Sequence, residues 1–168
     1  MEKIFFYENT PVGKLCIGEK DGAITRVTWN QIPTDAVEEE TELIKKCKQE
    51  LDEFIEGKRK AFDLPLAPEG TAFQKKVWWA LQEIPYGETR TYKDIAIAVG
   101  SPKGFRAVGM ANNKNPIAIL IPCHRVIGSD GKLVGYAAGI EMKTSLLALE
   151  QQERSFQTGK NWYSSTMQ

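Results

Sequence analysis

Alternation of apolar and polar positions dominates the first thirty residues of the chain. It predicts three strands, at residues 4–8, 14–19 and 23–29. Asp21-Gly22, between the last two, is a strong signal for a two-residue hairpin turn, because glycine adopts the positive φ that such turns need. The N-terminal segment is therefore predicted to be a small antiparallel meander.

From Asp35 the spacing changes to that of a helix, which we expect to end near Gly57. Its apolar residues share one face: Leu43, Ile44, Cys47, Leu51, Phe54 and Ile55. Residues 61–70 then contain two prolines and a glycine in an extended segment, which is the best candidate for a domain boundary. We therefore expect one domain at 1–70 and a second at 71–168, the latter with a core at 71–152 and a tail at 153–168.

The second half predicts helices at 72–84, 92–99 and about 103–112, and Thr71 and Thr91 are placed to cap the first two. The last two of these are joined by a short turn containing glycine, as in a helix-turn-helix motif. The same corner occurs in many helical domains that bind no nucleic acid. The pattern alone therefore leaves both interpretations open.

Small residues at 134–139 surround Tyr136 and predict a loop suited to lining a flat pocket. A final helix is expected at 140–152, with its apolar positions at Leu146, Leu147 and Leu149.

Composition narrows the class of protein. With 42 % apolar residues and four tryptophans, the chain can bury a substantial core and lacks the profile of a disordered protein. No apolar stretch approaches the length of a membrane span, so we expect no membrane association. Three scattered cysteines and one histidine form neither a disulfide framework nor a zinc-binding pattern, which favours a reducing cytoplasm and no metal site.

The net charge is zero, but the charges are unevenly distributed. Residues 1–70 carry 10 Lys/Arg against 15 Asp/Glu, whereas residues 71–168 carry 12 against 7. This asymmetry is compatible with an acidic scaffold and a second module that faces DNA, although two differently solvated surfaces would also produce it.

The strongest candidate for chemistry is Cys123, which follows an apolar run and Pro122 and precedes the only histidine, His124. The proline stiffens the chain that presents the thiol. A thiol is a useful nucleophile only as thiolate, and a neighbouring imidazole or cation lowers its pKa, so we expect Cys123 to be ionised. Composition alone favours a small buried core cysteine instead. The other two cysteines are expected to be core thiols of that kind: Cys16 and Cys47.

The predicted helix at 103–112 is rich in small residues, and Gly109 costs it about 1 kcal/mol of helix propensity relative to alanine. Small side chains let a helix approach a groove floor closely, and the long Arg106 could then insert into a base stack. Close helix–helix packing with a solvated Arg106 explains the small residues equally well.

The string Pro122-Cys123-His124-Arg125-Val126, preceded by Asn-Pro and the apolar run, resembles the active-site motif of the O6-alkylguanine-DNA alkyltransferases, the methylated-DNA–protein-cysteine methyltransferases. The similarity covers roughly residues 73–150 with the family's spacing, and the first seventy residues match loosely. It implies an α+β fold, with a ribonuclease H-like N-terminal domain of a small β-sheet plus helix. The C-terminal domain would be a mostly helical winged helix-turn-helix.

The resemblance also implies residue roles in catalysis. Cys123 is the expected alkyl acceptor, and His124 its general base through a bound water. Glu150 would orient His124, and Asn115 would brace the segment beneath the site. Tyr92 would rotate the 3′ phosphate and later help to protonate the departing guanine.

The resemblance further implies that the protein binds DNA through the minor groove, with little dependence on sequence, and that the damaged base is flipped out of the duplex. Arg106 is similar to the arginine that takes the place of the extruded nucleotide. The other expected DNA contacts are Thr91, Tyr92, Ala107, Gly109 and Ala111. The expected lining of the base pocket is Tyr136, Val126, Ala137, Ala138, Met110 and Pro122.

The implied activity is DNA repair by one irreversible transfer from O6-alkylguanine to the protein, O4-alkylthymine being a second candidate substrate. We expect double-stranded DNA as the partner, a monomer in the cytoplasm, and no cofactor or metal. The alternative is a non-catalytic alkyltransferase-like protein that only binds lesions, although such proteins replace the acceptor cysteine. Two positions depart from the family pattern, since Phe105 and Ala138 stand where a smaller residue and a glycine are more usual.

Overall fold

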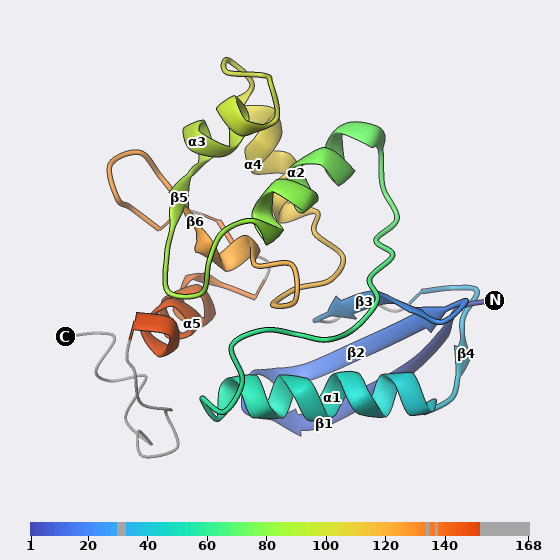
Figure 1. Cartoon of the computed structure of the whole chain (residues 1–168). Helices are drawn as coiled ribbons and strands as arrows, with labels where there is room; N and C mark the ends of the chain where they lie inside the picture. The colour runs from blue at the N-terminus through green and yellow to red at the C-terminus, as the bar shows by residue number, and fades with distance from the viewer. Residues whose placement is uncertain (30–32, 134, 137, 152–168) are drawn as a thin grey trace.

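The computed structural model describes residues 1–29, 33–133, 135–136 and 138–151, which form the expected α+β fold (Figure 1). The meander is confirmed as β1 (Lys3–Thr10), β2 (Gly13–Lys20) and β3 (Ala23–Thr28), which pair antiparallel. A short strand, β4 (Val37–Glu38), joins β1 in parallel, so the sheet order is β3-β2-β1-β4. Asp21 and Gly22 have φ of 52° and 80°, the two positive values that the predicted hairpin turn requires.

The first helix, α1 (Glu42–Ile55), starts later than the sequence pattern predicts. The expectation of helix from Asp35 is wrong, because residues 37–38 hydrogen-bond to β1 and Thr41 caps the helix by accepting from the backbone N–H of Ile44 at 3.2 Å. The predicted end is confirmed, since Gly57 follows the helix with a φ of 77°. The apolar face of α1 packs on the sheet.

The outer edge of β3 connects the sheet to the rest of the chain. Ile24 exchanges two backbone hydrogen bonds of 2.8 Å with residues 65–67, in the extended segment that follows α1. Val27 does the same with residues 116–118 at 2.9 and 3.0 Å, just before Cys123. The sheet therefore holds both the linker and the cysteine-bearing loop in place.

The second half is mostly helical. Its elements are α2 (Ala72–Gln82), β5 (Arg90–Thr91), α3 (Tyr92–Ala98), α4 (Phe105–Asn113), the single 3₁₀ turn η1 (Cys123–Arg125), β6 (Val126–Ile127) and α5 (Ile140–Gln151). Capping by Thr71 and Thr91 is confirmed, each within a capping box. The parallel pair β5–β6 was not predicted, because two-residue strands carry no readable periodicity.

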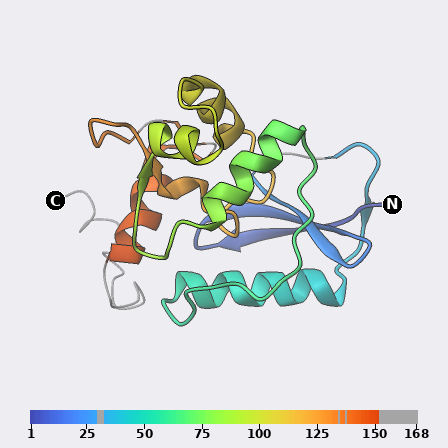
Figure 2. The same ribbon diagram turned by 45° about the horizontal axis from the view of Figure 1, so that its top comes forward.

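One apolar core runs through both halves of the chain. Trp78 of α2, Phe54 of α1, Ile24 of β3 and Ile117 of the cysteine loop are all fully buried in it. Figures 1 and 2 show α1 along the sheet and the later helices gathered on the side of β3. Among the described residues no helix is long and apolar enough to cross a membrane. The predicted tail at 153–168 lies outside the described residues.

Candidate active site

Cys123 is presented by a tight loop. The apolar run turns back at Ile119, whose φ of 72° lies in the left-handed region that a β-branched residue rarely adopts. The N–H of Ile121 donates to the carbonyl of Ile117 at 3.0 Å and closes the loop. Asn115 ties it together, since its Oδ1 accepts from Ile117 N at 3.0 Å and its Nδ2 donates to Ile121 O at 2.8 Å. Such strain persists only where the surrounding structure enforces it, so the thiol is held in place.

The thiol borders a cavity of about 400 Å³, a volume typical of small-molecule sites. Its walls come from the end of β3, including Trp29, from residues 112–116 at the end of α4, and from Tyr136. The Tyr136 ring packs edge-on against Trp29, with ring centroids 5.8 Å apart. Sequence analysis assigned the N-terminal half no role at the site. The wall formed by β3 depends on contacts between segments distant in sequence.

Of the predicted pocket residues that the structure describes, Tyr136 is the one that lines this cavity. Val126 is fully buried in β6, and Pro122 borders a different cavity; the expected contact of the Val126 backbone with guanine stays a prediction. Ala138 is half-buried outside the cavity lining. Ala137 lies outside the described residues.

The expectation that Cys123 is ionised by its histidine neighbour is wrong for the free protein. Cys123 is 5 % exposed, and burial raises the pKa of its thiol. Asn115, the Lys143 ammonium and the Tyr136 hydroxyl oppose that rise without cancelling it. His124 is not among the groups that lower the pKa, because burial keeps its imidazole neutral. The thiol is therefore a protonated acceptor that needs a base.

His124, the next residue in the chain, has the features that a base for this thiol would need. It is fully buried, its Nε2 lies 2.6 Å from Oε2 of Glu150, and burial lowers the pKa of the imidazole. With Nε2–H donated to the carboxylate, Nδ1 is the unprotonated nitrogen, and it has no hydrogen-bond partner among the described residues. A neutral imidazole with a free lone pair is the form that can accept a proton.

Arg125 holds the carboxylate of Glu150 in its charged form. Its Nε and Nη2 donate to the two carboxylate oxygens at 2.7 and 2.9 Å, and its Nη1 donates to the carbonyl of Ile84 at 2.8 Å. Burial raises the pKa of Glu150, but the hydrogen bonds from His124 and Arg125 outweigh it and bring that pKa to about 2. Arg125 lies within the motif, but nothing in the sequence indicated this role.

Two further residues near the thiol were missed. Asn112 is buried, and its Nδ2 donates to the carbonyl of Cys123 at 3.3 Å, which joins α4 to η1. Lys143 is fully buried, with its Nζ 3.4 Å from the carbonyl of Gly135 and 5.8 Å from the ring centre of Tyr92. Burial lowers the pKa of Lys143 to about 8, so it is mainly charged at neutral pH and favours a thiolate. A lysine in the first turn of a helix normally lies in solvent, so the sequence carried no signal for its burial.

Helix α4 turns its arginine and one of its three small residues, Ala107, outward. Arg106 and Ala107 are exposed, and Met110 is 68 % exposed, so Met110 does not line the cavity as predicted. Ala111 is buried beside Trp78, whose indole N–H donates to the Ala111 carbonyl at 2.8 Å. The expectation that Ala111 contacts DNA is therefore wrong for its side chain, which faces the core.

Tyr92 lies beneath this helix and close to the thiol. Gly109 faces its ring, since a side-chain carbon added there would stand 3.8 Å from the ring edge. Burial raises the pKa of Tyr92, and a thiolate at Cys123, once formed, would add to that rise. Thr91 precedes it as the N-cap of α3, half-buried.

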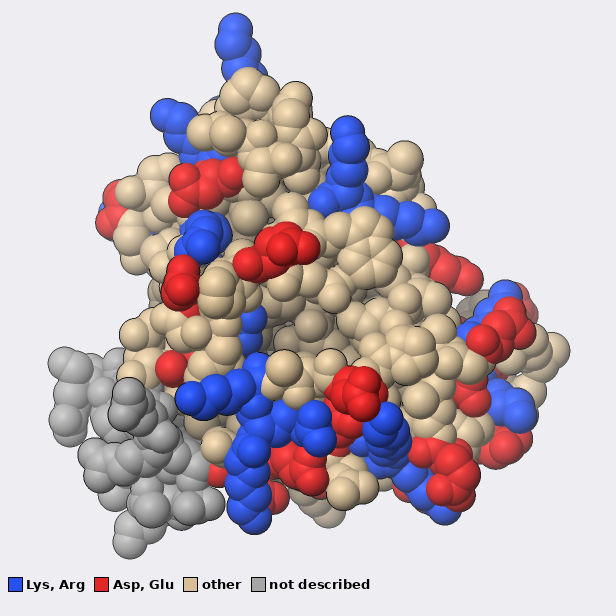
Figure 3. Space-filling view, viewed as in Figure 1, with Lys and Arg blue, Asp and Glu red and all other residues tan. Residues whose placement is uncertain are grey.

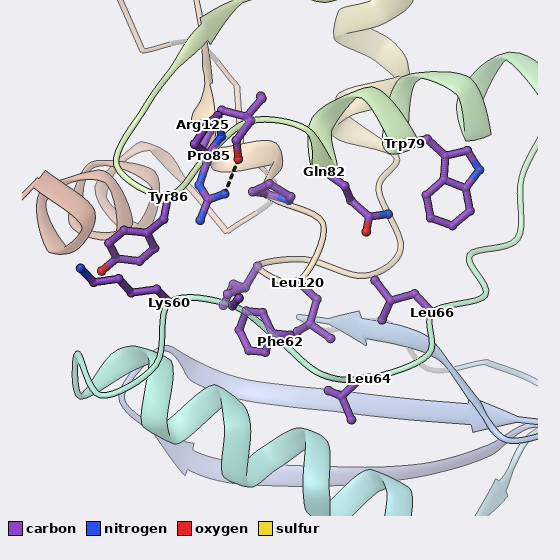
Figure 4. Close-up of a pocket in the computed structure, with 14 residues that line it drawn as sticks. Lys60, Phe62, Leu64, Leu66, Trp79, Gln82, Pro85, Tyr86, Leu120 and Arg125 are labelled. Atoms are coloured by element: carbon purple, nitrogen blue, oxygen red, sulfur yellow. Dashed lines mark hydrogen bonds between the residues drawn. The ribbon is translucent and has the colours of Figure 1, made fainter.

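A separate cavity of about 420 Å³ lies between the linker and the second half of the chain (Figure 4). Tyr86, Lys60 and Arg125 stand at one end of it, and Trp79 and Leu66 at the other. Cys123 does not line it. Among the described residues, no group of three or more His, Cys, Asp or Glu side chains is placed to hold a metal ion.

Cys16 and Cys47 show how the reactive site differs from an ordinary core. Both are buried as predicted, and burial raises their pKa values to about 11 and about 12. Neither has a buried imidazole paired with a carboxylate beside it. The site at Cys123 therefore defines a class of protein: one that uses a single thiol with a histidine–glutamate pair, on a domain that carries a helix-turn-helix.

Comparisons with known proteins identify that class. Residues 4–68 match the family described as "6-O-methylguanine DNA methyltransferase, ribonuclease-like domain", and residues 72–152 match its DNA binding domain. Methylated-DNA–protein-cysteine methyltransferase from Methanosarcina barkeri is 60 % identical over 121 residues, which cover 72 % of this chain and 76 % of the relative. The constitutive enzyme of that name from Bacillus subtilis is 49 % identical over 150 residues, covering 84 % and 91 %.

Among solved structures, Mycobacterium tuberculosis OGT in complex with DNA superposes with a TM-score of 0.85 at 39 % identity, covering 90 % of this chain and 94 % of that one. The chain belongs to the 6-O-methylguanine DNA methyltransferase family, whose members are the methylated-DNA–protein-cysteine methyltransferases.

Proposed function

We propose that this chain repairs alkylated DNA by moving the alkyl group of O6-alkylguanine to the sulfur of Cys123. The observation that carries the proposal is a single thiol at a 400 Å³ cavity, backed by the buried His124–Glu150 pair. The relatives' names and the DNA complex of the M. tuberculosis protein support the substrate class. O4-alkylthymine is a second candidate substrate of the same pocket.

The reaction needs a base, a nucleophile and an acid. Nδ1 of His124, through a bound water, accepts the thiol proton, and Glu150 stabilises the imidazolium that forms. The sulfur lone pair then forms a bond to the alkyl carbon while the carbon–O6 bond breaks, and its electron pair goes to guanine. The hydroxyl of Tyr92 helps to protonate that leaving group. The buried charge of Lys143 favours the thiolate during the attack.

The product is a thioether, which thiol exchange does not reverse because exchange requires a disulfide. Each chain therefore acts once and is consumed, and the reaction as written requires no cofactor. A free thiol is required until that event, which fits a reducing compartment.

DNA is proposed to bind on α3 and α4, where basic side chains project from the molecule (Figure 3). A base inside a duplex cannot reach Cys123, so the nucleotide must rotate out at a cost of a few kcal/mol. Arg106, exposed in the free protein, would fill the place it leaves. The small side chains beside it suit an approach to the minor groove, with little dependence on sequence.

The proposed organisation is a scaffold at 1–70 and a DNA-binding, alkyl-accepting domain at 71–168. The two family matches, at 4–68 and 72–152, support that division. The protein is proposed to act as a monomer on double-stranded DNA.

The decisive experiment is intact-mass measurement after mixing the protein with duplex DNA that contains O6-methylguanine. The expected result is one added methyl group per chain, located on Cys123 by peptide analysis, with no second turnover. A protein recovered unchanged from a complex with that DNA would instead identify a non-catalytic lesion binder.

Gly109→Ala is expected to affect the stability of the protein and its affinity for DNA in opposite directions. The new methyl group meets only the Tyr92 ring at an ordinary contact distance of 3.8 Å, so alanine is expected to raise the free energy of unfolding by about 0.5–1 kcal/mol. Gly109 is half-buried, so the same methyl group also widens the exposed edge of α4 beside Tyr92, and roughly tenfold weaker DNA binding is expected. Urea unfolding and fluorescence anisotropy with labelled duplex measure the two effects.

The matched control is Gly100→Ala in the turn between α3 and α4. Gly100 has a φ of 79°, so alanine there is expected to destabilise the fold. Tighter DNA binding by Gly109→Ala would contradict the close approach of α4.

A further inference from the structure

Two large apolar side chains stand exposed on α4. Phe105 is 50 % exposed and Met110 is 68 % exposed, on a helix whose other outward residues include Ala107 and the half-buried Gly109. Nothing in the free protein's described residues covers them. Exposed apolar side chains scattered singly need no explanation, but two that flank one exposed arginine on a short helix form a contiguous feature.

The directions in which Phe105, Arg106 and Met110 point can be inferred from the residues of α4 that are buried. Val108, Ala111 and Asn112 face the core. Arg106 and Met110, four residues apart, therefore share the opposite face, and Phe105 precedes them in the first turn. Around the helix axis Phe105 and Met110 lie on either side of Arg106, roughly 140° apart, and these three exposed side chains are called the ridge below.

Cations and a hollow accompany this ridge. Phe105 borders a surface hollow of about 450 Å³ together with Tyr92, Lys93 and Lys103, and Lys114 is exposed just past the helix. An apolar ridge surrounded by lysines suits a polyanion that also offers stacked, apolar surfaces, which is a description of duplex DNA. A second copy of the chain would offer the same positive ridge and would be repelled.

We infer that Phe105 and Met110 act with Arg106 as a three-residue wedge, which enters the minor groove of duplex DNA and bends it as the lesion is extruded. The inference rests on the proposed function, because it takes α4 to be the DNA-contacting helix. Phe and Met are among the side chains that proteins insert between base steps, where partial unstacking is offset by the apolar surface that is buried. Arginine alone would fill the vacated position but would leave the neighbouring step stacked.

The wedge has a thermodynamic signature distinct from a phosphate contact. Truncating an apolar wedge lowers affinity without changing the number of counterions released, so the slope of log K against log salt stays constant. Removing a lysine that contacts phosphate lowers the slope by about 1. The salt dependence therefore distinguishes the two kinds of contact.

The test compares Phe105→Ala, Met110→Ala and their double variant with the unchanged protein, on a duplex that contains O6-methylguanine. Each single variant is expected to bind about tenfold more weakly, while the slope of log K against log salt stays unchanged. Each is also expected to bend the DNA less, as measured by energy transfer between labels at the two ends of the duplex. Lys103→Ala provides the contrasting case, with a reduced slope. Trp79→Ala, which removes an aromatic 46 % exposed on α2 beside the other cavity, is the control and is expected to match the unchanged protein.

Alkyl transfer from a free O6-alkylguanine base separates the inference from the proposed function. The apolar variants are expected to react with the free base as the unchanged protein does. Variants that bind and bend the duplex like the unchanged protein would overturn the wedge, while methylation of Cys123 would still uphold the function. Failure of the unchanged protein to react with base or DNA would overturn the function instead.

Discussion

Replacing Cys123 by alanine is expected to abolish alkyl transfer while DNA binding persists. The thiol is the only group at the cavity placed with a base behind it, among the residues that the structure describes, so its loss should lower transfer by at least about 10⁴-fold. The DNA-facing residues of α4 do not depend on the sulfur, so affinity for the duplex should change by about twofold or less. Transfer is measured by the intact mass of the protein after mixing with DNA that contains the lesion. Affinity is measured by fluorescence anisotropy at constant salt concentration.

Cys16→Ala is the matched control for this substitution. It removes another buried sulfur, 1 % exposed in β2, and is expected to lower stability while the protein still takes up one methyl group. Methyl uptake by Cys123→Ala would identify another acceptor. Joint loss of transfer and DNA binding in a folded variant would contradict the division of roles between η1 and α4.

Replacing Glu150 by glutamine is expected to have the largest effect on stability. The carboxylate accepts from His124 and from two nitrogens of Arg125 in a buried setting, so its removal leaves the arginine charge without compensation. Breaking a buried pair in this way costs about 3–5 kcal/mol at neutral pH. Transfer should slow as well, because the imidazolium that forms on His124 loses its anion.

The stabilisation that Glu150 provides should depend on pH in a direction set by the pKa of its carboxyl group. The folded pKa of Glu150, about 2, lies below the ordinary value of 4.5, so its contribution is complete above pH ~4.5 and disappears as the pH falls through about 2. The free energies of unfolding of the unchanged and Glu150→Gln proteins, measured in urea, should therefore differ most at pH 7 and converge towards pH 2.

Glu53→Gln is the control for burial. Glu53 also meets an arginine, with its Oε1 2.8 Å from Nε of Arg59, but both side chains are about one-third exposed. Water screens that pair, so its loss should change stability little. A constant difference between the Glu150 proteins from pH 7 to pH 2 would contradict the assigned ionisation of the carboxylate.

The order of ionisation at the site also explains how a reactive thiol is kept safe before it meets its substrate. Burial holds Cys123 protonated at rest, whereas Lys143 and the neutral His124 stand ready to favour and to generate the thiolate. A protonated, 5 % exposed thiol reacts slowly with oxidants and other electrophiles. Such protection would suit the single-use acceptor proposed above.

Local signals in the sequence determined the secondary structure. The alternation before Trp29, the two threonine caps and the glycine at position 57 predicted strands and helix ends that the structure confirms. Each depends on a residue and its near neighbours in the chain, which is why it could be read from the sequence. The early start predicted for α1 failed for the opposite reason, because the pairing of β4 with β1 joins residues more than thirty positions apart.

At the site, the sequence by itself identified Cys123 and His124 as the candidate thiol and base, because the two are adjacent in one motif. Only the tertiary structure decided the protonation of Cys123, the place of Trp29 in the cavity wall, and the burial of Arg125 and Lys143. These properties depend on which distant segments exclude water from a group and which charges they bring to it. Desolvation and Coulomb energy are set by distances in space, and neighbours along the chain do not specify those distances.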